Sequence, residues 1–98
     1  MKPIRVAVIG CGTIAEKQHV RHYARHPQAE LRYLVDVRPE RAQALAETYR
    51  VPFVETDYRN ILRDEELDAV SICTPNHTHA EIAVACLEAG KHVLCEKP

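Results

Sequence analysis

Two hydrophobic patterns alternate along this chain of 98 residues. Short apolar runs of the kind found in buried strands are followed by longer segments whose apolar residues have helical spacing. The sequence predicts strands at 4–9, 31–35, 51–54, 69–73 and 92–95, and helices at 13–25, 39–49, 58–63 and 77–89. Strands and helices that alternate with short connections form parallel sheets with right-handed crossovers. We therefore expect an α/β fold with a doubly wound parallel sheet and helices on both faces.

The composition is that of a globular chain and indicates no special partner. Apolar residues make up 46% and charged residues 28%, and 13 basic residues against 14 acidic ones leave a net charge of −1. This balance favours neither nucleic acid nor an anionic membrane as a partner. No apolar run reaches the ~18–20 residues of a membrane span. Four cysteines without the spacing of a disulfide framework favour a reducing, cytoplasmic compartment.

A glycine-rich loop follows the first predicted strand. Residues 10–15 read Gly-Cys-Gly-Thr-Ile-Ala and fit the G-x-G-x-x-A pattern between a strand and a helix. In this pattern Gly10 permits a tight turn, Gly12 lets the backbone approach a pyrophosphate, and Ala15 allows close packing of helix and strand. The free N–H groups of the first helical turn then face the phosphate charge. The alternative is a plain strand-to-helix turn.

An acidic residue ends the second predicted strand. Asp36 stands close to where a carboxylate binds the adenosine ribose hydroxyls in dinucleotide-binding folds. Asp36 alone could be a helix N-cap, but together with the glycine loop it favours dinucleotide binding. A carboxylate repels a 2′-phosphate, which favours NAD over NADP, whereas the guanidinium of Arg38 could pair with that phosphate.

Four segments of the chain form the pattern of one known family. They are 8–15 with the glycine loop, Asp36, the Thr-Pro-Asn-His-Thr-His run at 74–79, and 89–93 followed by Glu-Lys-Pro at 96–98. On these residues, and over essentially all of its length, the chain resembles the N-terminal domain of the Gfo/Idh/MocA oxidoreductases. The resemblance implies a Rossmann-like sheet of five strands in the order 3-2-1-4-5, without the family's sixth strand and substrate domain.

The resemblance also implies contacts to an NAD or NADP cofactor. The implied cofactor-binding residues are Gly10, Gly12, Thr13 and Ile14 at the pyrophosphate, Asp36 at the adenosine ribose, Thr74, Pro75, Asn76 and His79 in a turn beside the nicotinamide, and Glu96 bordering the nicotinamide. Arg38, which could pair with a 2′-phosphate, is a further candidate cofactor-binding residue. Lys97 is implied as the catalytic residue that reaches the substrate hydroxyl or carbonyl.

The function implied is hydride transfer between a nicotinamide cofactor and a hydroxyl group of a sugar or polyol. Residues 1–98 would be the dinucleotide-binding domain of a larger two-domain enzyme, and the chain alone is expected to show negligible turnover. A non-catalytic nucleotide-binding module and an inert half-fold fragment are the alternatives. The fifth strand would present an unpaired edge, so a homodimer through the uncovered sheet edge or face is expected.

Other histidines and cysteines have structural interpretations. We expect a solvated helix face for three histidines, His19, His22 and His26. We expect small, buried thiols rather than a redox cluster at three strand ends, Cys11, Cys73 and Cys95. Cys73, His77 and His79 have the residue types of a zinc site. Their strand-to-helix context favours a cofactor turn instead, and no metal is expected.

One departure from the family concerns a helix end. Family members commonly have glycine after the tyrosine that ends the second helix, whereas Arg50 follows Tyr49 here. A non-glycine residue in a left-handed cap costs about 1 kcal/mol. We expect this departure to affect stability rather than chemistry.

Overall fold

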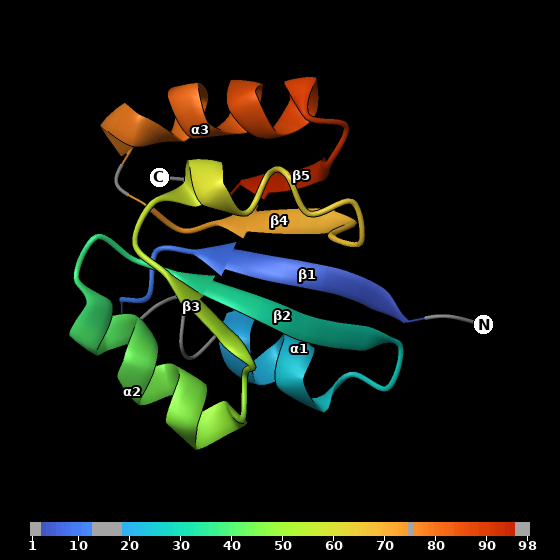
Figure 1. Cartoon of the computed structure of the whole chain (residues 1–98), viewed down its shortest axis with the longest axis vertical. Helices are drawn as coiled ribbons and strands as arrows, with labels where there is room; N and C mark the ends of the chain where they lie inside the picture. The colour runs from blue at the N-terminus through green and yellow to red at the C-terminus, as the bar shows by residue number, and fades with distance from the viewer. Residues whose placement is uncertain (1–2, 13–18, 75, 96–98) are drawn as a thin grey trace.

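Five parallel strands form one sheet in the computed structural model of the chain, which describes residues 3–12, 19–74 and 76–95. The strands are β1 (Ile4–Ile9), β2 (Ala29–Val35), β3 (Phe53–Glu55), β4 (Ala69–Ile72) and β5 (His92–Cys95). Their order is β3-β2-β1-β4-β5, and all neighbouring pairs are parallel (Figure 1). The predicted fold class and the order 3-2-1-4-5 are therefore confirmed.

Helices cover both faces of the sheet. They are α1 (Arg21–Arg25), α2 (Pro39–Tyr49), α3 (Asn76–Glu88) and the short 3-10 helix η2 (Tyr58–Asn60). The α1 segment and α2 pack on one face, and α3 and η2 pack on the other (Figure 1). Because side chains alternate along a strand, Val8 of β1 joins the first core cluster, while Ala7 and Ile9 join the second. The two cores thus share β1 as their common wall.

Several element boundaries differ from the expected ones; the helix expected at 58–63, for example, is the short 3-10 helix η2 at Tyr58–Asn60. β3 begins at Phe53 rather than at residue 51, because Pro52 has no N–H to donate to the sheet. β2 begins earlier than expected, at Ala29, which pairs with Ile4 of β1. Of the helix expected at 13–25, residues 13–18 lie outside the described residues, and α1 forms its last part.

The end of α2 has the left-handed cap that was expected at Arg50. This residue caps the helix in the left-handed conformation, with φ 58° and ψ 44°, and its N–H donates to the carbonyl of Ala46. Arg50→Gly is expected to raise the free energy of unfolding by about 0.5–1 kcal/mol, because glycine adopts this conformation without strain while gaining freedom in the unfolded chain. Urea denaturation measures the change. Arg50→Ala, which keeps a Cβ, should bring no gain, and equal stabilisation by both variants would contradict the explanation.

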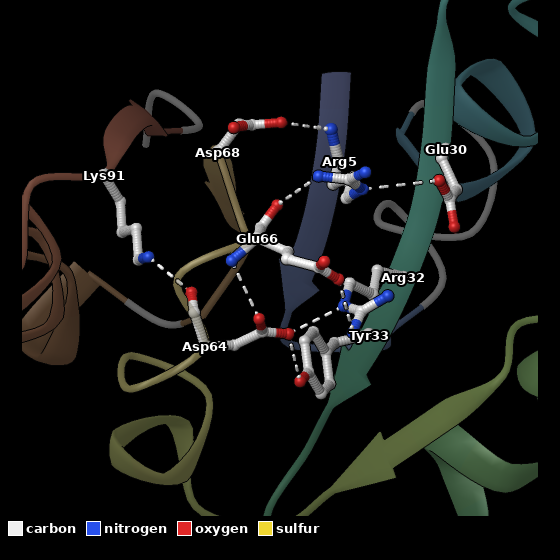
Figure 2. A network of polar contacts seen from close by, with 8 residues as sticks. All are labelled: Arg5, Glu30, Arg32, Tyr33, Asp64, Glu66, Asp68 and Lys91. Atoms are coloured by element: carbon white, nitrogen blue, oxygen red, sulfur yellow. Dashed lines mark hydrogen bonds and ion pairs between the residues drawn. The ribbon is translucent and has the colours of Figure 1, made fainter. Parts of the chain in front are cut away.

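β2 carries one extra residue in its middle. Its pairing with β1 passes from Leu31 directly to Tyr33, so Arg32 forms a β-bulge. The bulge lets two consecutive side chains reach one carboxylate. The Arg32 Nε and the Tyr33 hydroxyl both donate to Oδ2 of Asp64, at 2.7 Å and 2.6 Å respectively (Figure 2).

Asp64 belongs to a polar network at the amino-terminal edge of the sheet (Figure 2). Its carbonyl oxygen accepts a hydrogen bond from Lys91 Nζ at 2.7 Å, and the backbone N–H of Arg5 donates to Oδ2 of Asp68 at 2.8 Å. Asp68 and Lys91 immediately precede β4 and β5. The network therefore ties together the beginnings of β1, β4 and the edge strand β5.

Removing the Asp64 charge is expected to lower stability in a pH-dependent way. The pKa of this carboxyl falls from its ordinary 3.8 to about 2, first because the Tyr33 hydroxyl donates to it and further because Arg32 does. A carboxyl with a lowered pKa in the folded state stabilises the fold above its unfolded pKa. Asp64→Asn should therefore lower the free energy of unfolding by about 2 kcal/mol at pH 7.

The difference between wild type and Asp64→Asn should shrink as the pH falls from about 4 towards 2, because the carboxyl becomes protonated over this range. Urea denaturation at a series of pH values measures it. The matched control is Glu65→Gln, an exposed neighbour, which should leave stability unchanged. A difference for Asp64→Asn that stays constant down to pH 2 would argue against the charge as its cause.

Candidate functional site

A cavity of about 710 Å³ lies at the carboxyl-terminal edge of the sheet. Its lining residues are Ile9, Gly10, Cys11, Gly12, Val35, Asp36, Val37, Arg38, Arg41, Thr56, Tyr58, Cys73, Thr74, Thr78, Glu81 and Ile82. In doubly wound sheets ligands bind at this edge, where the strand order reverses, and here β1 has β2 on one side and β4 on the other. The cavity brings together Gly10, Gly12, Asp36, Arg38 and Thr74, five of the residues that the sequence predicted.

Gly10 joins the end of β1 tightly to the end of β4. Its φ is +97°, and a Cβ at this position would lie 2.8 Å from the carbonyl carbon of Cys73 and 2.9 Å from its oxygen. The N–H of Gly10 donates to the carbonyl of Val35 at 2.7 Å. Both the backbone conformation and the close approach therefore require glycine here.

Gly12 has a different environment. A Cβ at this position would meet no described atom within 4 Å, and the residue lines the cavity. The described residues therefore leave the space beside this backbone open. A ligand can approach the chain here as closely as the glycine pattern requires for a pyrophosphate.

The Asp36 carboxylate links the glycine loop to the end of β2 by a hydrogen bond. Its Oδ2 accepts the backbone N–H of Cys11 at 2.8 Å, and its Oδ1 accepts the backbone N–H of Arg38 at 2.8 Å. Each oxygen of a carboxylate can accept a second hydrogen bond, so ribose hydroxyls can still bind. The sequence predicted the ribose contact but not this link, which depends on a contact between distant residues.

Cys11 has the properties of a buried structural thiol. Its pKa is raised to about 12, first by burial and then by the neighbouring Asp36 and Cys73. Its Sγ donates to the carbonyl of Val35 at 3.6 Å. A thiol with so high a pKa is not a nucleophile at neutral pH, which confirms the structural interpretation for Cys11. Cys73 is half-buried, and the side chain of Cys95 lies outside the description.

Two buried polar side-chain atoms in the segment 74–79 have no hydrogen-bond partner among the described parts of the chain. They are Oγ1 of Thr74 and Nε2 of His79. Leaving such a group unsatisfied costs about 1–3 kcal/mol, which favours a partner from a bound ligand. Thr74 lines the cavity itself. Together with the open space at Gly12, its hydroxyl fits a site that is completed by a cofactor.

Several lining residues were missed by the sequence reasoning. They are Arg41, Thr56, Tyr58, Thr78 and Glu81. Thr56 and Tyr58 follow β3, just as the predicted residues Asp36 and Thr74 follow β2 and β4. Thr78 and Glu81 lie three positions apart on α3, a spacing that places them on one helix face. Their place at one cavity depends on how α3 and η2 pack against the sheet.

Other predicted site residues fall outside the described ranges. This holds for Thr13, Ile14, Pro75, Glu96 and Lys97, and for the side chain of Asn76. Among the described residues no group of three or more metal-ligating side chains gathers. Over the same ranges no helix has the length and apolar character to cross a membrane.

The prediction of a solvated face was wrong for His19. This side chain is buried, with 9% of its surface exposed, and its Nδ1 lies 3.1 Å from Oγ of the buried Ser71 on β4. Ser71 offers a polar partner beneath the helix segment, which is why the histidine turns towards the sheet. His22 and His26 are exposed, as expected.

Comparison with known proteins identifies similar domains. A family model described as "Oxidoreductase family, NAD-binding Rossmann fold" matches residues 4–98. The chain is 45% identical over 96 residues to the D-glucoside 3-dehydrogenase of Escherichia coli (strain K12), covering 98% of the chain and 27% of that protein. It is 36% identical over 95 residues to the myo-inositol 2-dehydrogenase of Thermotoga maritima, covering 97% of the chain and 28% of that protein.

Solved structures give the same picture. A 3-ketoreductase from Actinomadura kijaniata in complex with NADP and TDP-benzene has a TM-score of 0.90 and 38% identity, covering 99% of the chain and 30% of that protein. A scyllo-inositol dehydrogenase from Lactobacillus casei with bound NAD(H) and scyllo-inositol has a TM-score of 0.90 and 30% identity, covering 99% and 28%. The chain thus spans 27–30% of the length of these four proteins.

Proposed function

Because the chain belongs to the Gfo/Idh/MocA oxidoreductase family, whose NAD-binding Rossmann domain it carries, we propose that its cavity holds a nicotinamide dinucleotide for hydride transfer to or from a sugar or polyol. One observation carries this proposal. The cavity is lined by the open backbone of Gly12, the hydrogen-bonded carboxylate of Asp36 and the Thr74 hydroxyl, which has no partner among the described residues; the three follow different strands. These are groups suited to a pyrophosphate, a ribose and a polar cofactor atom.

Each residue has a proposed role in binding. The backbone of Gly10, Gly12, Thr13 and Ile14 would donate to the pyrophosphate, Asp36 would accept from the ribose hydroxyls, and Thr74, Pro75, Asn76, His79 and Glu96 would surround the nicotinamide. When bound, the nicotinamide gives or takes a hydride. Lys97 would donate a hydrogen bond to the substrate oxygen and stabilise negative charge on it. The assignments at residues outside the described ranges rest on the resemblance to the family.

NAD is the proposed cofactor, because the Asp36 charge opposes the 2′-phosphate of NADP. Asp36→Ala is expected to weaken NAD binding about tenfold and NADP binding less, since the ribose hydroxyls lose their acceptor while the phosphate loses a repulsive neighbour. Calorimetric titration of both dinucleotides measures the two changes. Equal losses for both would argue against the ribose contact.

A second variant at position 36 tests the negative charge of the side chain separately from its size and hydrogen bonding. Asp36→Asn keeps one oxygen that can accept the N–H of Cys11 or Arg38 but removes the negative charge. Asp36→Asn should therefore raise the affinity for NADP relative to that for NAD. It should also preserve the conformation of the glycine loop better than Asp36→Ala does. Glu88→Gln, on an exposed part of α3 outside the cavity, is the matched control and should change neither affinity.

The proposed substrate class comes from the relatives. The dehydrogenases and the ketoreductase that resemble the chain are named for D-glucosides, inositols and a keto group. A chimera tests the proposal: the chain replaces the matching domain of the E. coli D-glucoside 3-dehydrogenase, with which it shares 45% identity. A folded chimera that oxidises glucosides with NAD supports the function. A folded chimera that binds NAD without turnover contradicts it.

We also propose that two copies of the chain associate through β5. Within the described residues this strand pairs only with β4, and Leu94 on it is 53% exposed. An unpaired strand edge is a template for another strand. Light scattering at high concentration should give the mass of a dimer, and a monomer would contradict this proposal.

The proposed compartment is the cytosol. Four cysteines without framework spacing suit a reducing environment, and Cys11 is held as a protonated thiol by its raised pKa.

A further inference from the structure

The outer part of the cavity is built by elements that do not belong to the dinucleotide fingerprint. Thr78, Glu81 and Ile82 of α3 line it from one side, and Tyr58 of η2 lines it from another. The three α3 residues have the spacing of a single helix face. Ile82 is buried at its base, whereas the Glu81 side chain is 67% exposed at its rim. An apolar floor with a carboxylate at the rim is suited to a flat, aromatic group that carries a hydrogen-bond donor on its edge.

Glu81 forms a surface ion pair with Arg59 of η2, in which the side chains are 67% and 65% exposed. Its Oε1 lies 3.5 Å from Nη2 of Arg59. The guanidinium of Arg59 lies over the ring of Tyr58, 5.3 Å from its centre, and its Nη1 is 3.6 Å from Oδ2 of Asp57. Asp57 in turn accepts the backbone N–H of Arg59 and caps η2. These contacts restrain Arg59, which can therefore orient the carboxylate at the cavity rim.

The lining residues include two carboxylates, which differ in the hydrogen bonds that they already accept. Both oxygens of Asp36 already accept backbone N–H groups, and this residue is assigned to the ribose. Glu81 is engaged through Oε1 and can accept further hydrogen bonds. On the edge of an adenine ring the exocyclic amino group is the donor, while N1, N3 and N7 are acceptors. The remaining carboxylate therefore matches the one donor of the base.

We infer that Glu81 accepts a hydrogen bond from the 6-amino group of the adenine ring, and that it makes the cavity select 6-aminopurine dinucleotides over 6-oxopurine dinucleotides. Arg59 acts as a positioning residue for this carboxylate. A 6-oxopurine places carbonyl lone pairs where the amino hydrogens would be, and these lone pairs face the negative charge of Glu81. The inference rests on the proposed cofactor function and names the residue that reads the base.

The test compares two probes, NAD and nicotinamide hypoxanthine dinucleotide, by calorimetric titration of the 98-residue chain. The wild type is expected to bind NAD about tenfold more tightly, a difference of about 1.4 kcal/mol. Glu81→Gln should reduce this ratio to about one, because a side-chain amide can accept from an amino group or donate to a carbonyl. Arg59→Ala should lower the ratio about two- to threefold by releasing the carboxylate.

A control variant at Glu88 shows whether any change is specific to Glu81, and two results would contradict the inference. Glu88→Gln removes a charge from α3 outside the cavity and should keep the wild-type ratio. Circular dichroism confirms that the variants fold. If Glu81→Gln binds NAD and keeps the wild-type ratio, this inference is wrong while the proposed function stands. If the wild type binds neither dinucleotide, the proposed function is wrong and this inference fails with it.

Discussion

The Gly10→Ala variant is expected to lose about 2–5 kcal/mol of its free energy of unfolding, a large share of the 5–15 kcal/mol that stabilises a typical domain. Two costs combine. A φ of +97° is strained for any residue with a Cβ, and the added carbon would lie 2.8 Å from the carbonyl carbon of Cys73. That neighbour is backbone at the end of β4, so it cannot move aside by changing a rotamer. Either the glycine loop or β4 has to shift.

A second glycine allows the two costs to be separated. Gly90 has a φ of +81°, but a Cβ there would meet no described atom within 4 Å. Gly90→Ala should therefore show the conformational cost alone, about 1 kcal/mol. Urea denaturation of both variants, followed by circular dichroism, measures the difference. Similar losses at the two glycines would show that the contact with Cys73 is unimportant.

The strands and helices could be predicted because each element is short and local in its pattern, whereas the order of the strands was implied by the resemblance to the family. What could not be predicted is the pairing detail that long-range contacts decide. Leu31 and Leu34 are three residues apart and would face opposite sides of a regular strand, yet both belong to the same core cluster. The bulge at Arg32 makes this arrangement possible. Nothing in the hydrophobic pattern alone indicates an extra residue there.

The same limit applies to single side chains. His19 was expected in solvent because histidines recur along its helix, but its partner Ser71 is 52 residues away in sequence. Hydrogen bonds of this kind depend on which strand lies beneath a helix. Only the assembled sheet brings the two residues together.

For the site, the sequence predicted the residues that a local motif contains. Gly10, Gly12 and Asp36 follow from the pattern of a glycine loop and an acidic strand end, and all three line the cavity. The hydrogen bond from the Cys11 N–H to Asp36 depends on how closely β1 and β2 end beside each other. Glu81 becomes visible only when α3 is placed over the carboxyl-terminal edge of the sheet.

The second large effect is expected for Gly12→Ala, and it concerns binding rather than stability. The added Cβ would meet no described atom within 4 Å, and no positive φ requires glycine at this position. Stability should therefore change by less than about 1 kcal/mol, within the range of ordinary surface substitutions and helix-end effects. The methyl group would occupy the space in which the pyrophosphate is proposed to approach the backbone.

Because the phosphate must move away from the N–H groups that bind it, NAD affinity is expected to fall about 100-fold, or about 2.7 kcal/mol. Calorimetric titration of Gly12→Ala with NAD measures this loss, and urea denaturation of the same sample shows that the fold is retained. The contrast with Gly10→Ala is the decisive feature: two glycines separated by one residue should affect different properties, one the fold and the other the ligand. A Gly12→Ala chain that binds NAD as tightly as the wild type would place the pyrophosphate elsewhere in the cavity.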